Sequence, residues 1–399
     1  MMSSAKLKAN NDWLVWARET AYYDIDKIAE KMKVDSNQIE EWESTGKIEY
    51  TNLVKLAKHY KRPPMIFFNL NKPKNIKQIN DFRSMGSKKV EITPEISFEL
   101  RNAEVRRKRL LNFEEESKDY SIPEFELSNL DNNSSSELAY DIRDRIGMKS
   151  ANMKRRDLDY WIKQIESLGI LIFQFYGFEP KEIRGYAIYH DKLPIIGINS
   201  REYENGKKFT LFHELAHIIQ KNEGLSNFNE YFLKNKEEIY CNNLAAEILV
   251  PSNILTNLIV SRENQNTDQR NIEFFSKHFR VSKEVIIRRL LTLKFISKSE
   301  YKNNQNTWDS YIGKKDKTNK KTSTKTEKKP KDNELPIDHS VSYKRKATNI
   351  LNRNGIFYTE SMIRAYDDNL ISIDDLVENL GVPIEVIDQI RNRLNEEES

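Results

Sequence analysis

The chain has 399 residues, more than one ordinary hydrophobic core accommodates, so we expect two or three domains. Its 65 basic and 61 acidic residues leave a net charge of only +4, which excludes an argument for nucleic-acid binding from overall charge. The single cysteine, Cys241, excludes an internal disulfide framework. Because the sequence also lacks a signal segment and an apolar run near the roughly 18 residues that cross a bilayer, we expect a soluble cytoplasmic protein without a membrane partner.

Residues 1–72 are predicted to form a helical domain. Apolar residues recur at helical spacing in four short segments between residues 11 and 68. These segments contain Trp13, Ile28, Ile39 and Leu53, respectively. Residues 33–35 make the short connection expected inside a helix-turn-helix unit, and Ser36 is placed to cap the N-terminus of the third helix.

This segment resembles the small helix-turn-helix domains of the XRE/Cro repressor class. The residues that carry the resemblance are Arg18-Glu19-Thr20, Ile28-Ala29, Val34, Trp42-Glu43 and Gly46. In that class the third helix enters the major groove, which would bring Ser36, Asn37 and Gln38 to DNA or to a partner. The same helix carries three glutamates, and residues 1–70 hold eleven basic against ten acidic residues. DNA binding and docking to a protein therefore both stay open.

Residues 73–145 are predicted to form a helical connector. After a polar start, the stretch from Ile96 to Tyr120 has the pattern of a long basic helix, whose charges we interpret as a solvated face. A Ser/Asn-rich turn at residues 131–136 precedes two further helical segments before residue 168. No chemistry is assigned to this turn.

A small sheet and a motif helix follow. Residues 170–175, 185–189 and 194–199 are rich in β-branched and aromatic side chains, which predicts three strands. The next helix carries His213-Glu214-Leu215-Ala216-His217. Histidines at i and i+4 lie one turn apart on one face, so both imidazoles can bind one metal ion while the glutamate points toward a metal-bound water as general base. The spacing predicts one Zn²⁺ per chain, held by His213 and His217, with Glu214 catalytic.

A catalytic zinc site needs a third protein ligand. The candidates after the motif are Glu230, Glu237, Glu238, Cys241 and Glu247. Glu238 and Asn242 share one face of a helix that ends at Pro251, so we assign Glu238 as the third ligand and Asn242 as a hydrogen-bond partner of a ligand histidine. Cys241 is interpreted as a small packed residue. Tyr186, Tyr203 and His190 are candidates for stabilising the oxyanion, and the sequence does not distinguish them.

The C-terminal third divides by composition. Residues 261–312 are predicted to be a helical, helix-turn-helix-like module whose apolar positions pack a core. Residues 313–337 are predicted to be a flexible linker, because nine lysines lie between Lys314 and Lys331. Residues 338–399 regain helical periodicity and are predicted to form a C-terminal helical module.

The motif region resembles the ImmA/IrrE family of metallo-endopeptidases in Phe209–His217 and Glu238–Pro251. The resemblance extends to Asn199, to the N-terminal helix-turn-helix, and to Ala365-Tyr366 and Leu380-Gly381-Val382. Departures from the family pattern are Ala216 for glycine, Cys241 for alanine and Leu244 for phenylalanine; these are packing changes. We therefore predict an α+β fold, predominantly helical and multidomain, with a small-sheet, zincin-like (HExxH) catalytic domain at residues 146–260.

The resemblance implies a zinc endopeptidase that cleaves a transcriptional repressor, commonly of the XRE class, to induce a prophage, a mobile element or a stress or defence response. The partners implied are that protein substrate and, through the N-terminal helices, DNA. Two alternatives stay open from the sequence. One is a DNA-binding transcriptional regulator whose zinc site is structural or sensory, and the other is a toxin-antitoxin or defence component.

Overall fold

The computed structural model describes residues 6–73, 92–117, 120–127, 134–147, 157–221, 224–226, 236–261, 269–301 and 339–398. The chain divides into two compact units, residues 1–109 and 110–399. The predicted linker at residues 313–337 and the ligand candidate Glu230 lie outside the described residues.

The first unit contains the four expected helices, α1 (Asn11–Thr20), α2 (Ile25–Met32), α3 (Ser36–Thr45) and α4 (Tyr50–Tyr60). Their core comes from the apolar positions that set the helical periodicity, among them Leu14, Ile28, Ile39 and Leu53. The pattern did not indicate the short antiparallel pair β1 (Lys6–Lys8) and β2 (Lys47–Glu49), nor the 3-10 turn η1 (Pro64–Phe68). Three-residue strands carry too little alternation to be seen in a sequence.

The N-terminus of α3 differs from the sequence expectation. Asp35, not Ser36, is the N-cap, because its Oδ1 accepts the Asn37 N–H at 2.9 Å. Ser36 is the first helical residue, and its hydroxyl donates to Asp26 at 2.7 Å. The Gln38 side chain donates to Glu41 at 2.8 Å, and Asn37 is exposed. The expectation that Ser36 caps the helix was wrong, while the binding role of residues 36–38 stays a prediction.

One of the three glutamates on α3 is turned inward. Glu43 accepts a two-pronged ion pair from Arg18 of α1, at 2.7 and 3.1 Å, with both side chains largely buried. This pair ties α3 to α1. The acidic surface expected along α3 is therefore reduced to Glu40 and Glu41, which are exposed.

The long basic helix is present as α5 (Pro94–Glu116). Its charges are not simply a solvated face. Arg101 is half-buried and donates to the Tyr60 carbonyl at 3.1 Å, with its guanidinium 5.8 Å from the centre of the Phe98 ring. Burial lowers the pKa of both Arg101 and Arg107. The solvated-face interpretation was wrong for these arginines.

The second unit is built around a mixed sheet. The three predicted strands are confirmed as β3 (Leu171–Phe175), β4 (Gly185–Ile188) and β5 (Ile195–Asn199). A fourth strand, β6 (Gly224–Ser226), was not expected. The order is β3-β5-β4-β6, with β3 parallel to β5 and the other neighbours antiparallel. The observed helices and small sheets are consistent with the predicted α+β fold. They do not test the prediction that the domain is zincin-like.

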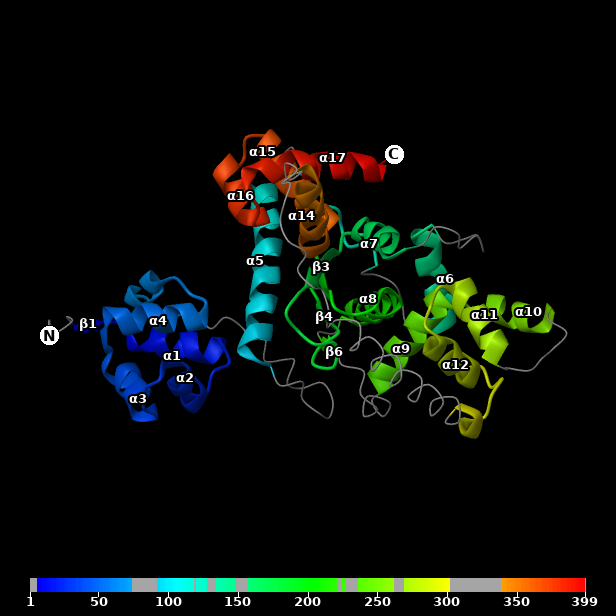
Figure 1. The fold of residues 1–399 in the computed structure, drawn as a ribbon, viewed down its shortest axis with the longest axis horizontal. Coiled ribbons are helices and arrows are strands. Elements are labelled where there is room, and N and C mark those ends of the chain that lie inside the picture. Colours follow the sequence, from blue (N-terminus) through cyan, green and yellow to red (C-terminus); the bar gives the residue numbers. More distant parts are fainter. Residues whose placement is uncertain are drawn as a thin grey trace, which may run out of the picture. The chain divides into compact units, whose positions relative to one another are not determined.

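Helices cover this sheet. The motif helix α8 (Glu204–Ile219) packs on β4 and β5, and α9 (Lys236–Leu249) packs on α8 (Figure 1). Pro251 ends α9 as expected. The remaining helices around them are α6 (Ser135–Arg145), α7 (Leu158–Glu166), α10 (Ser252–Ser261), α11 (Gln269–Phe279) and α12 (Lys283–Thr292).

One apolar core joins these elements. It runs from Phe125 to Ile296 and includes Trp161, Phe212 and Phe275. Burial of such a side chain stabilises a fold by roughly 1.5–3 kcal/mol. The core thus contains residues from both the predicted catalytic domain, 146–260, and the predicted helical module, 261–312. The prediction that apolar residues of this module pack a core is confirmed at Phe275 and Leu290. The boundaries between the ranges stay predictions.

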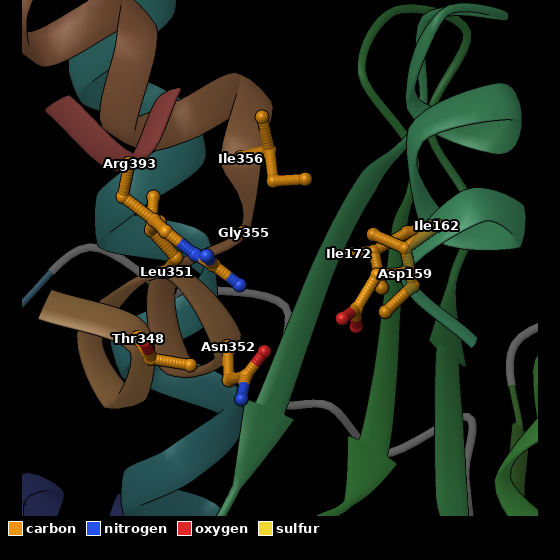
Figure 2. Close-up of a pocket in the computed structure, with 9 residues that line it drawn as sticks. All are labelled: Asp159, Ile162, Ile172, Thr348, Leu351, Asn352, Gly355, Ile356 and Arg393. Carbon is orange, nitrogen blue, oxygen red and sulfur yellow. The ribbon is translucent and has the colours of Figure 1, made fainter. Parts of the chain in front are cut away.

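The C-terminal helical module contains α14 (His339–Asn354), α15 (Ile356–Asp367), α16 (Ile373–Leu380), η4 (Ile384–Val386) and α17 (Ile387–Glu398). It contacts the sheet, because α14 packs against β3 and the Tyr358 ring meets Phe173 edge-on at 6.1 Å. Figure 2 shows the junction, where Asp159 of α7 and Arg393 of α17 point toward one another across a cavity of about 20 Å³. That volume holds about one water molecule.

A buried carboxyl from α7 caps α15. Glu166 is only 3% exposed, and its Oε2 accepts the Phe357 N–H at 3.2 Å. The Ile356 and Ile172 amides also donate to this carboxyl. The helix needs this cap because its own N-cap residue, Gly355, has no side chain. Gly355 has φ +79°, and a Cβ there would lie 2.4 Å from the Ile172 carbonyl oxygen.

None of the described helices is by itself long and apolar enough to cross a membrane. Among the described helices, one consecutive pair, α9 and α10, is long and apolar enough when the two are taken together, and this pair is bent by 56° at its break. Most of the apolar side chains of α9 lie in the core described above.

We predict that Glu166 makes the stability of the fold depend on pH. Burial raises its pKa well above the ordinary 4.5, so the folded chain keeps this proton to a higher pH than the unfolded chain. The free energy of unfolding should therefore fall as the pH rises from about 4.5 to the raised pKa, by at most about 1.4 kcal/mol per pH unit.

Glu166→Gln cannot ionise and should not show this loss. Urea unfolding followed by circular dichroism across a pH series measures the free energy of unfolding of both chains. As the pH rises, that of Glu166→Gln should increase relative to that of wild type. Glu166→Ala, which removes the cap, should be less stable than either chain at every pH. Parallel pH profiles for wild type and Glu166→Gln would contradict this account.

Candidate functional site

The motif helix α8 lies at the centre of the second unit. Its ten buried residues run from Lys208 to Ile218, and Leu211, Phe212 and Leu215 belong to the apolar core. The polar residues of the motif are buried with them, since His213 and Glu214 are 0% exposed and His217 is 3% exposed. Polar groups buried in this way are costly unless each finds a partner. Neighbouring elements should therefore supply partners.

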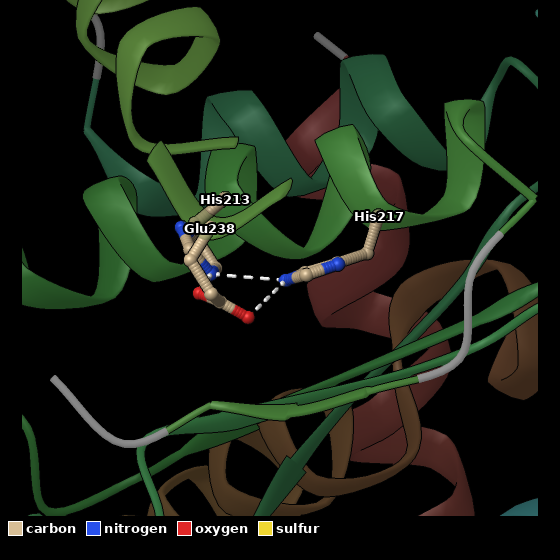
Figure 3. Close-up of side chains that lie close together, drawn as sticks. All are labelled: His213, His217 and Glu238. Atoms are coloured by element: carbon tan, nitrogen blue, oxygen red, sulfur yellow. Dashed lines mark hydrogen bonds and ion pairs between the residues drawn. The ribbon is translucent and has the colours of Figure 1, made fainter. Parts of the chain in front are cut away.

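Helix α9 supplies the partner of the two histidines. Glu238, in its first turn, reaches both rings, with Oε2 3.3 Å from His213 Nε2 and Oε1 3.4 Å from His217 Nε2. The two Nε2 atoms are 3.1 Å apart (Figure 3). One ligand atom from each residue lies within 4.8 Å of the others. The three residues assigned from the sequence as ligands are thus brought to one point.

Electrostatics at this cluster favour a cation. Burial lowers the pKa of His213, which favours the neutral ring that a metal ligand must have. At His217 burial also acts to lower the pKa, but Cys241 and Glu238 outweigh it and raise that pKa well above its ordinary value. Burial by itself would raise the pKa of Glu238, but hydrogen bonds with His213 and His217 outweigh it and hold that pKa well below its usual range. The carboxyl group is therefore ionised and faces two ring nitrogens.

The cluster fits a divalent metal ion. The two Nε2 atoms are 3.1 Å apart, close enough for one metal ion to contact both. Two imidazole nitrogens and a carboxylate oxygen are a donor set that zinc accepts, and three protein ligands are the number found at catalytic zinc sites. The residues could hold a metal ion.

Glu214 points from α8 toward the sheet. A Cβ on Gly185 of β4 would lie 2.6 Å from Glu214 Oε1 and 2.6 Å from Thr210 Cγ2. Any larger residue at position 185 would therefore displace the Glu214 carboxylate. Glycine is required here by close approach, not by backbone conformation. The sequence analysis did not identify Gly185, because nothing in the sequence shows which strand residue faces the motif helix.

Two residues of α9 contact the two histidine rings. Asn242 hydrogen-bonds His213, in the role expected from its position one turn after Glu238. Cys241 Sγ lies 3.6 Å from His217 Nδ1 and is fully buried. Cys241 is packed as expected, but its contact with a ligand histidine was missed. Its spacing of three residues from Glu238 is the signal that could have indicated it.

Two of the three candidates for oxyanion stabilisation, Tyr186 and Tyr203, lie away from the cluster. The Tyr186 ring stacks on Phe175 at 5.4 Å and covers Gly197, on the sheet face opposite to the one that Gly185 presents to Glu214. Tyr203 is 86% exposed and precedes α8, about 15 Å along the helix from His213. His190 lies in the loop between β4 and β5. The structure is against Tyr186 and Tyr203 in this role.

A polar network fixes the start of α8. Glu202 accepts a hydrogen bond from Thr210 at 2.8 Å and an ion pair from Arg184 at 3.2 Å. Asn199, at the end of β5, donates to the carbonyls of Phe178 and Ile183 and accepts the Arg201 N–H. Glu202 therefore links α8 to Arg184, the residue before β4. Asn199 instead holds the connection between β3 and β4 against the end of β5.

Comparison with known proteins places this region in context. Residues 165–291 match the model of the Peptidase M78 family, described as the IrrE N-terminal-like domain. The matched segment contains β3, β4, β5, α8 and α9 and therefore every residue of the cluster. No curated protein matches the chain. The match supports the resemblance to the ImmA/IrrE family and a metallopeptidase domain in this segment; it does not extend to the N-terminal helices.

We predict that His217→Ala removes the bound metal. The substitution deletes one of three converging donors, so a purified chain that carries about one metal ion should carry close to none. Elemental analysis by mass spectrometry measures the content and identifies the element. His59→Ala, in the first unit, is the matched control and should keep the wild-type content. Retention of the metal by His217→Ala would show that the metal is bound elsewhere.

Proposed function

We propose that the chain is a zinc-dependent endopeptidase that acts on a specific regulatory protein. The observation that carries this proposal is the convergence of His213, His217 and Glu238 beside a buried glutamate, inside a segment that matches a peptidase family. A bound zinc ion would act as a Lewis acid and would lower the pKa of a coordinated water to about 7.

The chain's own groups have distinct roles in this proposal. His213, His217 and Glu238 hold the ion, and Asn242 and Cys241 orient the two rings. Glu214 takes the proton from the attacking water and returns it to the leaving amine. Gly185 leaves the space in which the Glu214 carboxylate sits. The low solvent exposure of these groups strengthens their electrostatic effects.

The substrate that we propose is a transcriptional repressor of the XRE class, and its cleavage would induce a mobile element, a prophage or a stress or defence response. This part rests on the resemblance of the chain to the ImmA/IrrE family. It is compatible with the first unit, where the Arg18–Glu43 pair and the exposed Glu40 and Glu41 make α3 a poor surface for phosphates. We therefore propose that this helical unit docks a protein.

We predict that Glu214→Gln abolishes proteolysis but keeps the metal. Loss of a general base slows a reaction by about 10²–10⁴-fold, while the three ligands are untouched. Cells that express wild type and cells that express Glu214→Gln can be compared by labelling of new protein N-termini. Wild type should produce one or a few new N-termini, in a repressor, that the variant lacks. Identical N-termini in both cultures would count against a peptidase.

We also predict that Gly185→Ala lowers cleavage without loss of metal. The added Cβ would collide with Glu214 Oε1, and a misplacement of about 1 Å can slow catalysis on the order of 10²-fold. Cleavage of the substrate identified by N-terminal labelling gives the rate, and elemental analysis gives the metal content. Wild-type rates for Gly185→Ala would show that Glu214 does not need this space.

A further inference from the structure

A second feature of the catalytic unit has no role in the chemistry above. A cavity of about 310 Å³ lies between α8, α9 and α12. Its apolar wall consists of Phe209, Ile239, Ala246, Val285, Leu291 and Tyr301. Ala246 of α9 is partly exposed and faces this cavity, while the neighbouring Ala245 is fully buried in the helix contact.

The cavity lies directly beside the metal ligands. Phe209, in its wall, is one helical turn before His213, and the two rings stack with centroids 6.3 Å apart. Asn242, also in its wall, hydrogen-bonds the same His213 ring. A polypeptide whose scissile bond reaches the cluster would therefore have a side chain within reach of this cavity.

The charges in the wall are balanced. The cavity is lined by Arg184, Arg288 and Arg289, and each guanidinium forms an ion pair with a glutamate. The partners are Glu202 at 3.2 Å, Glu284 at 2.8 Å and Glu247, respectively. A charged occupant would be desolvated without gaining a free counter-charge. The wall therefore favours a neutral occupant.

The size and the lining select an apolar group. A cavity of roughly 150 Å³ already accommodates a benzene ring, so this one holds an aromatic side chain with room to spare. We propose that the cavity receives a large apolar, preferably aromatic, side chain of the polypeptide substrate next to the bond that is cleaved. This inference rests on the proposed peptidase function and adds the class of residue that the enzyme selects.

The test uses Ala246→Leu, which fills the cavity from its partly exposed wall, and Val260→Leu as the control. Val260 is 70% exposed on α10 and does not line the cavity. With a mixed peptide library, wild type and Val260→Leu should cleave peptides with an aromatic residue at one fixed position at least tenfold faster than those with alanine there. In Ala246→Leu this preference, measured as the ratio of the cleavage rates for aromatic and alanine peptides, should fall at least tenfold.

A binding measurement keeps the inference testable if the library contains no substrate. The probes are two hydroxamic acids that differ only in a benzyl or a methyl side group, titrated calorimetrically into the full zinc-loaded chain. The benzyl compound should bind wild type at least tenfold more tightly than the methyl compound, and Ala246→Leu should lose that difference.

The outcomes separate the two proposals. Equal binding of the two hydroxamic acids, no binding of either, or an unchanged ratio in Ala246→Leu would overturn the role of the cavity, even if the chain cleaves proteins. If Ala246→Leu no longer distinguishes the benzyl from the methyl compound while Val260→Leu still does, the role of the cavity is supported. This conclusion would hold even if the new N-termini expected of a peptidase were not found. Thermal melting of each variant checks that it is folded.

Discussion

The candidate site depends on the contact between α8 and α9. Packing of Cys241, Leu244 and Ala245 against the motif helix brings Glu238 within 3.3 and 3.4 Å of two histidine rings that are buried and close together. Without α9, His213 and His217 would be buried polar groups without a carboxylate partner, which is costly. The apolar helix contact and the polar cluster therefore stabilise one another.

The sheet constrains the same helix from its other side. β4 must present a glycine to Glu214, and Glu202 links α8 to Arg184 at the start of β4. Helix α12 is fixed to α9 by the buried pair of Arg289 and Glu247. The cluster, the glutamate and the neighbouring cavity are thus positioned by contacts from several elements.

The two ends of the chain contribute differently. Helix α14 packs on β3 and Glu166 caps α15, so the C-terminal module contributes to the frame of the second unit. The N-terminal helices form their own core and their own buried ion pair, Arg18 with Glu43. Because its charge is balanced, this unit is better suited to contact with a protein than with a phosphate backbone. We therefore propose that it docks the substrate.

The sequence by itself determined the local features. Periodicity predicted most of the described helices, although not α10, and three of the four strands of the main sheet, because a longer segment shows its pattern more clearly. The spacing of His213, Glu214 and His217 depends only on helix geometry, and Glu238 and Asn242 follow from the same one-turn rule on α9. Tertiary structure decided the rest. The need for glycine at position 185, the Cys241 contact, the inward turn of Glu43 and the cavity behind Ala246 depend on which surfaces of distant elements meet, and one chain's residue pattern carries no record of those pairings.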